Sequence, residues 1–143
     1  MGKKISIKTR LLLQDKNRIL LVKQTKQNGG KFTFIGGHCE KNEFAKATLV
    51  REAKEEMDIT ISPKNLQLVH VLHKKDVQSM RIILYFKAVS WDGVPRNLEP
   101  EKFEKVDWYN FENLPKGLSR TARHVLKRYR NGNLYSELEK LES

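Results

Sequence analysis

The sequence predicts an α/β fold in which helices pack on a mixed β-sheet, because strand-like segments outnumber helical ones and one helix is inserted early and one late. Segments rich in Ile, Leu and Val and bounded by Gly, Pro, Asn or Asp are typical of strands. Such segments occupy residues 4–15, 18–24, 31–37, 59–62, 66–73, 80–90 and 105–111. The chain has no repeat and no linker, so we expect one domain over residues 1–143.

The first half of the chain is expected to form a hairpin, a short strand and a helix. Asp15-Lys16-Asn17 suits a tight turn between the first two strands. The third strand ends in two glycines, Gly36 and Gly37. Asn42 is a suitable N-cap, and we expect the helix to run from about residue 43 to residue 57.

The second half is expected to contain four strands and a final helix. Asp58 interrupts the helical pattern, residues 59–62 resume as a strand, and Pro63 stops it. Two longer strands follow, and a loop at residues 91–102 precedes the last strand. Ser119 is a suitable N-cap for a helix that ends near Arg130, before Asn131 and Gly132.

The composition indicates a cytoplasmic protein. Hydrophobic residues make up 38% of the chain, which is enough for a modest core. Cys39 is the only cysteine, so no internal disulfide can form. No apolar run approaches the roughly 18 residues of a membrane span, so we expect no membrane partner.

The net charge of +11 is unevenly distributed along the chain. Residues 1–31 carry nine Lys and Arg against the single Asp15, whereas residues 32–115 carry twelve against thirteen Asp and Glu. Residues 116–130 add six Lys and Arg without an acid. This asymmetry suits a polyanionic ligand such as a phosphate compound, although a solvated basic surface would have the same composition.

Three carboxylates share one face of the first predicted helix. Glu52, Glu55 and Glu56 fall on one stripe at about 100° per residue, and like charges at this spacing repel by a few tenths of a kcal/mol. Apolar residues on another side are expected to face the sheet: Val50, Ala53 and Met57. Convergent carboxylates are the oxygen ligands that Mg²⁺ prefers, and the cation would offset their repulsion. An exposed acidic face is the simpler alternative.

The stretch from residue 37 to residue 59 resembles the signature of the Nudix hydrolases, G-x5-E-x7-R-E-U-x-E-E-x-G-U with U aliphatic. Eight of the nine specified positions match over 23 residues: Gly37, Glu43, Arg51, Glu52, Ala53, Glu55, Glu56 and Ile59. Asp58 replaces the usual glycine, and Asp tolerates a left-handed helix end. We call residues 37–59 the box. Most of the chain shares the resemblance, which is to MutT-like members that act on nucleoside triphosphates.

The resemblance implies a Nudix-type α/β/α sandwich, with the box helix and a C-terminal helix packed on the sheet. It also implies a catalytic machinery that depends on Mg²⁺, for which Mn²⁺ could substitute. The implied metal ligands are Glu52, Glu55, Glu56 and the backbone carbonyl of Gly37. Glu43 and Arg51 would form the ion pair that fixes the loop to the helix.

Glu52 is the expected general base, which would deprotonate the attacking water. Some members of the family take the base from a later loop, for which this chain offers Glu99, Glu101 and Glu104. Substrate-binding candidates are Lys23, which resembles phosphate-contacting residues of the family, His38, which follows Gly37, Glu101 in the later loop, and Trp108, which could stack on a base.

The expected activity is hydrolysis of a phosphoanhydride bond in a nucleoside diphosphate linked to another group, X. A nucleoside triphosphate, including oxidised or other noncanonical ones, is the favoured substrate. ADP-ribose, nucleotide sugars and RNA 5′ ends are the competing substrates, and a nucleotide sensor without catalysis is the competing kind of protein. We expect no DNA partner, and the sequence leaves the choice between monomer and homodimer open.

Overall fold

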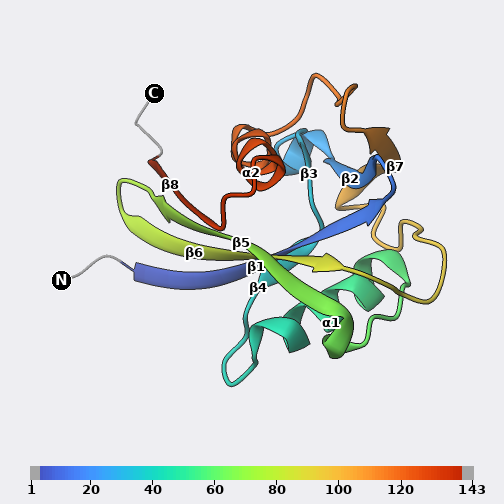
Figure 1. Cartoon of the computed structure of the whole chain (residues 1–143), viewed down its shortest axis with the longest axis horizontal. Coiled ribbons are helices and arrows are strands. Elements are labelled where there is room, and N and C mark those ends of the chain that lie inside the picture. The colour runs from blue at the N-terminus through green and yellow to red at the C-terminus, as the bar shows by residue number, and fades with distance from the viewer. Residues whose placement is uncertain (1–3, 140–143) are drawn as a thin grey trace.

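A computed structural model describes residues 4–139 of the chain (Figure 1). Along the chain these residues form β1 (Lys4–Asp15), β2 (Arg18–Gln24), β3 (Phe32–Thr33), β4 (Gly36–His38), α1 (Ala45–Met57), β5 (Leu66–Lys75), β6 (Ser79–Ala88), β7 (Phe103–Asn110), α2 (Arg120–Arg130) and β8 (Tyr135–Glu139). Short 3₁₀ turns occupy Lys26–Asn28 and Pro63–Asn65. No helix in the described part of the chain is long and apolar enough to cross a bilayer.

The sheet is mixed, and β1 is the strand that joins its parts. The strand order is β3-β2-β1-β6-β5-β8, with β4 also paired to β1 and β7 to β2. Residues 4–13 of β1 run parallel to residues 79–88 of β6, whereas β1 is antiparallel to β2 and to β4. The long β1 therefore brings the glycines of β4 and the middle of β6 to its two sides.

Side chains alternate along β1 and divide the core into two clusters. Leu11 and Leu13 face the cluster under α1, and Leu12 faces the cluster under α2. Each helix adds buried side chains to its own cluster: Leu49, Ala53 and Met57 from α1, and Ala122, Val125 and Leu126 from α2. The two helices lie on opposite sides of the strands (Figure 1). The predicted α/β/α sandwich is therefore confirmed.

The predicted turn and helix-end signals hold at three places. The hairpin between β1 and β2 turns at Lys16, which has a φ of 55°. The Ser119 hydroxyl accepts a hydrogen bond from the Ala122 amide at 3.1 Å and caps α2, which ends at Arg130. Asp58 adopts the left-handed conformation (φ 57°, ψ 36°) and ends α1 where the family usually has glycine.

The start of α1 differs from the prediction. The helix begins at Ala45 with Phe44 as its N-cap residue, two residues later than expected. Asn42 does not cap it, because Asn42 has a φ of 67° and belongs to the preceding turn. The Thr48 side chain instead donates to the Glu43 carboxylate at 2.6 Å, so Glu43 closes the loop onto the first turn.

Two strand assignments also change. Residues 59–62 form no strand, because only Thr60 bridges to another segment, by two backbone hydrogen bonds to Asp92. β8 was not predicted, since its sequence Tyr-Ser-Glu-Leu-Glu is mainly polar and lacks a run of apolar residues. Only Leu138 of this strand packs against the core. Backbone pairing with β5, parallel over residues 135–139, holds it in the sheet.

The buried face of α1 is rotated relative to the predicted one. Ala53 and Met57 are buried as expected, but Val50 is only half-buried. Leu49 and Glu56 take the central positions of the buried face, and Glu56 has a 1% exposed side chain. One of the three predicted metal-binding carboxylates therefore lies inside the protein rather than on its surface.

Gly36 allows β4 to pass close to β1. It has a φ of +148°, and a Cβ added there would lie 2.1 Å from the Thr9 carbonyl oxygen. We expect Gly36→Ala to lower the free energy of unfolding by more than about 2 kcal/mol, because both the conformation and the space exclude a side chain. Gly132→Ala is the control, since Gly132 has a φ of +79° but no neighbour within 4 Å. Urea denaturation measures both, and equal losses would contradict the steric explanation.

Candidate active site

The contact between β4 and α1 places the Glu52 carboxylate against the backbone of Gly37. A Cβ on Gly37 would lie 2.7 Å from Oε1 of Glu52, so a side chain there would displace this carboxylate. The Gly37 carbonyl accepts a hydrogen bond from the Thr9 hydroxyl at 3.2 Å, and Gly37 pairs with Thr9 in the ladder between β1 and β4. The two predicted ligands of a metal ion are therefore adjacent.

Arg51 connects the carboxylates of the box. Its guanidinium donates two hydrogen bonds to Glu43, at 3.0 and 3.1 Å, in the paired geometry that Arg and carboxylate favour. Its Nη1 also donates to Glu52 at 3.0 Å and to Glu55 at 3.4 Å. The predicted ion pair between Glu43 and Arg51 is present, and the same arginine orients Glu52.

The Glu43 pair predicts a specific dependence of stability on pH. Hydrogen bonds from Arg51 and Thr48 lower the pKa of Glu43 from 4.5 to about 2. A carboxyl group with a lowered pKa stabilises the fold above its unfolded-state pKa, and this contribution disappears as the pH falls from about 4.5 towards 2. We expect Glu43→Gln to lower the melting temperature at pH 7. Near pH 2.5, the melting temperatures of the variant and the wild type should be similar. Glu101→Gln, at an exposed carboxylate on another loop, should show no such dependence.

Glu56 is paired with a lysine from the loop before β7. Its Oε2 accepts a hydrogen bond from Lys102 at 2.6 Å, and its Oε1 accepts one from the Gly36 amide at 3.2 Å. The Leu98 amide donates to the Glu56 carbonyl at 3.0 Å and anchors the loop against α1. Burial raises the pKa of Glu56, and Lys102 partly opposes this effect.

The donor set fits a hard divalent cation, although the carboxylates are not gathered around one point. Within residues 4–139, no three His, Cys, Asp or Glu side chains form a group placed to hold a metal ion. The predicted ligands all offer oxygen atoms: Glu52, Glu55, Glu56 and the Gly37 carbonyl. Burial raises the pKa of Glu52 and of Glu56, a cost that a cation would relieve. Small side-chain movements away from Arg51 and Lys102 would free these carboxylates.

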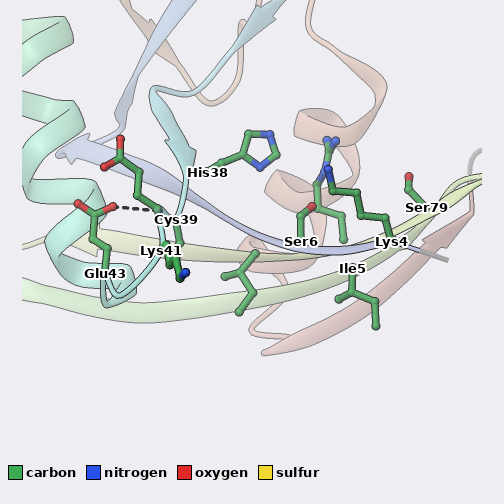
Figure 2. A pocket seen from close by; sticks show the side chains of 11 residues that line it. Lys4, Ile5, Ser6, His38, Cys39, Lys41, Glu43 and Ser79 are labelled. Atoms are coloured by element: carbon green, nitrogen blue, oxygen red, sulfur yellow. Dashed lines mark hydrogen bonds between the residues drawn. The ribbon is translucent and has the colours of Figure 1, made fainter. Parts of the chain in front are cut away.

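Two hollows adjoin the box. One, of about 240 Å³, is lined by Gly37, Glu56, His38 and three basic side chains: Lys8, Arg10 and Lys102. The second, of about 710 Å³, also includes His38. Figure 2 shows this larger hollow extending from Glu43 at one end to Lys4 and Ser79 at the other, with His38 between them. We call the first the inner cavity and the second the outer groove.

The inner cavity includes three cations that the sequence analysis missed: Lys8, Arg10 and Lys102. Lys8 and Arg10 are two residues apart on β1 and so lie on the same face of the strand. Burial and the neighbouring Arg10 and Arg81 lower the pKa of Lys8 to about 7. Burial also lowers the pKa of His38, followed by the charge of Lys8. The alternation of charged and apolar residues along β1 was the signal that could have identified the first two.

The remaining predicted substrate-binding residues lie outside both hollows. Lys23 pairs with Glu104 at 3.5 Å. Trp108 stacks on Trp91, with 6.4 Å between ring centroids, and covers the edge of the core under α1. Glu101 is exposed on the loop, next to the lysine that contacts Glu56. Of these candidates, His38 alone is brought to the box, and the roles of all four stay predictions.

A strand that begins with two glycines lies against a helix that carries three glutamates, and a Glu-Arg pair closes the loop between them, as the box implied. The NUDIX domain model matches residues 8–129, which include β1 from Lys8 onward, the box and α2 almost to its end. The chain therefore belongs to the NUDIX domain family. Nudix hydrolases generally need a divalent metal ion.

One curated relative resembles part of the chain. The chain is 29% identical over 99 residues to the NAD-capped RNA hydrolase NudC of Photorhabdus laumondii subsp. laumondii, a match that covers 69% of this chain and 37% of that protein. The chain thus spans little more than a third of the length of this curated relative.

Solved structures share the fold. A MutT NUDIX hydrolase from Burkholderia pseudomallei superposes with a TM-score of 0.79 at 23% identity, over 87% of this chain and 98% of that one. An ADP-ribose pyrophosphatase from Streptococcus suis superposes with a TM-score of 0.58 at 16% identity, over 94% of this chain and 98% of that one. These likenesses confirm the Nudix fold.

Proposed function

We propose that this protein is a Mg²⁺-dependent pyrophosphohydrolase that cleaves a phosphoanhydride bond in a nucleoside diphosphate linked to X. A nucleoside triphosphate, including oxidised or other noncanonical ones, is the proposed substrate. The observation that carries the proposal is the junction of an acidic helix with a cavity lined by cations. The acids suit a divalent metal and the cations suit a phosphate chain.

Each box residue has a distinct part in this proposal. Glu52, Glu55, Glu56 and the Gly37 carbonyl would hold Mg²⁺, or Mn²⁺ in its place. When bound, the ion supplies positive charge that stabilises the charge developing on the phosphate oxygens. Glu52 accepts the proton of the attacking water. Arg51 orients Glu52 through the 3.0 Å hydrogen bond, and Glu43 holds Arg51 in place.

RNA 5′ ends are the second candidate substrate. The outer groove continues from the box along β1 and β6, and basic side chains line it: Lys4, Lys41 and Arg81. Such a groove suits a substrate that extends beyond one nucleotide and carries further phosphates. Similarity to NudC, whose name describes a hydrolase of NAD-capped RNA, supports the same candidate.

A panel of compounds incubated with the protein and Mg²⁺ tests the proposal. Pyrophosphate and a nucleoside monophosphate as products would support the triphosphate substrate. AMP with ribose 5-phosphate would identify ADP-ribose, and release of a sugar phosphate would identify a nucleotide sugar. Removal of pyrophosphate from a triphosphorylated oligoribonucleotide would identify RNA. Turnover of no compound would favour the nucleotide sensor.

We infer a single domain over residues 1–143, since the family match takes up most of the chain. We also infer a cytoplasmic location, where Cys39 would remain reduced, and a small nucleotide rather than DNA or a membrane as partner.

A further inference from the structure

Lys8 is a half-buried cation without a partner. It lies on β1 between His38 of β4 and Ile83 of β6 in the sheet register. No hydrogen bond or ion pair joins its side chain to another residue within residues 4–139. The charges that lower its pKa are all positive: Arg10, Arg81, Lys74 and Lys102. Burying an ammonium group among like charges is unfavourable unless an anion is supplied.

Arg10 reinforces this positive wall from the same face of β1. Its guanidinium donates to the Phe34 carbonyl at 2.9 Å, which fixes its position and leaves other N–H groups available. Both side chains line the inner cavity beside Gly37, where the backbone reaches the Glu52 carboxylate. An anion in this cavity would contact the two cations and lie next to the proposed metal ligands.

We propose that Lys8 and Arg10 form a phosphate subsite in the inner cavity. This subsite holds a non-reacting phosphate of a polyphosphate chain, next to the phosphate that is attacked beside the α1 helix. The inference rests on the proposed function and assigns two residues of β1 to substrate recognition. A second phosphate of the substrate would neutralise the unpaired ammonium group while the neighbouring phosphate lies at the proposed metal ligands. Lys8 thereby favours substrates with at least two adjacent phosphates.

Binding of inorganic tripolyphosphate to the protein in EDTA, at pH 6.5, tests the subsite without metal or catalysis. Isothermal calorimetry should show that Lys8→Met weakens binding by at least about tenfold, the usual effect of one charge-assisted contact. Lys8→Arg should retain most of the affinity. Lys105→Met is the matched control, because this substitution removes the same charge. Lys105 is exposed on β7 and lines neither hollow.

Equal affinity in Lys8→Met and the wild type would overturn the subsite, as would equal weakening in Lys8→Met and Lys105→Met. Lys8→Gln keeps a polar side chain and should weaken binding as Lys8→Met does, so poor folding of one variant leaves the test intact. The subsite and the proposed function can be refuted independently of each other. Tripolyphosphate binding that depends on Lys8, with no nucleotide hydrolysed, would refute the proposed function and keep the subsite. Nucleotide hydrolysis with an unchanged KM in Lys8→Met would refute the subsite and keep the proposed function.

Discussion

Glu52→Gln is expected to lower kcat by about two to four orders of magnitude at saturating Mg²⁺ and substrate, the usual contribution of a general base. The Glu52 side chain is 15% exposed and lies against Gly37, so a glutamine fits the same space. It can still accept the hydrogen bond from Arg51 but cannot take a proton from water. Substrate affinity should change much less than kcat.

The alternative places the base in the loop before β7. There Glu99 lies 3.8 Å from Lys102 and Glu101 is exposed, whereas Glu104 lies on β7 itself and pairs with Lys23. Measuring kcat for Glu99→Gln, Glu101→Gln and Glu104→Gln beside Glu52→Gln decides between the two positions. A loop variant slower than Glu52→Gln, with unchanged metal affinity, would reject Glu52 as the base.

Glu56→Gln is expected to reduce turnover at least about a hundredfold while the protein remains folded. Glutamine can still accept the hydrogen bond from Gly36, and Lys102 is exposed enough to turn towards water. Loss of the charge weakens metal binding directly. Added Mg²⁺ should raise the melting temperature of the wild type, because it binds the native state, and raise that of Glu56→Gln less.

Lys102→Met is the companion variant for this experiment. Lys102 contacts the Glu56 carboxylate at 2.6 Å and therefore competes with a metal ion for it. Without that competitor, the rise in melting temperature on adding Mg²⁺ should be at least as large as in the wild type. A stable, fully active Glu56→Gln enzyme with the normal response to Mg²⁺ would show that Glu56 is not a ligand.

The sequence predicted most of the fold because the signals were local. The turn at Lys16, the cap at Ser119 and the left-handed Asp58 depend on the conformational preferences of single residues. β8 carries no comparable signal, since backbone pairing with β5 holds a segment whose side chains mostly face water. Parallel pairing between distant segments leaves little trace in the side-chain pattern.

The box could be located from sequence, but its surroundings could not. Helical periodicity placed the glutamates on one stripe, yet the position of the sheet relative to that stripe depends on tertiary packing. Leu49 lies between Glu56 and Ala53 around the helix. Because Leu49 is buried against the sheet, the neighbouring Glu56 is buried as well. Lys8 lies 29 residues before Gly37 and Lys102 lies 46 residues after Glu56, and only the fold brings them to the box.

Arg51 makes the box a single thermodynamic unit. One guanidinium is shared by Glu43, Glu52 and Glu55. Removal of any one carboxylate therefore changes the strength of the hydrogen bonds that Arg51 donates to the other two. Free-energy changes from paired substitutions at Glu43 and Glu52 should therefore deviate from additivity, and the deviation should vanish in an Arg51→Met background. Arg51→Lys would not preserve this coupling, because an ammonium group cannot span several acceptors with a planar fork. Sequence change in this segment is thus constrained jointly, across residues that lie up to twelve positions apart.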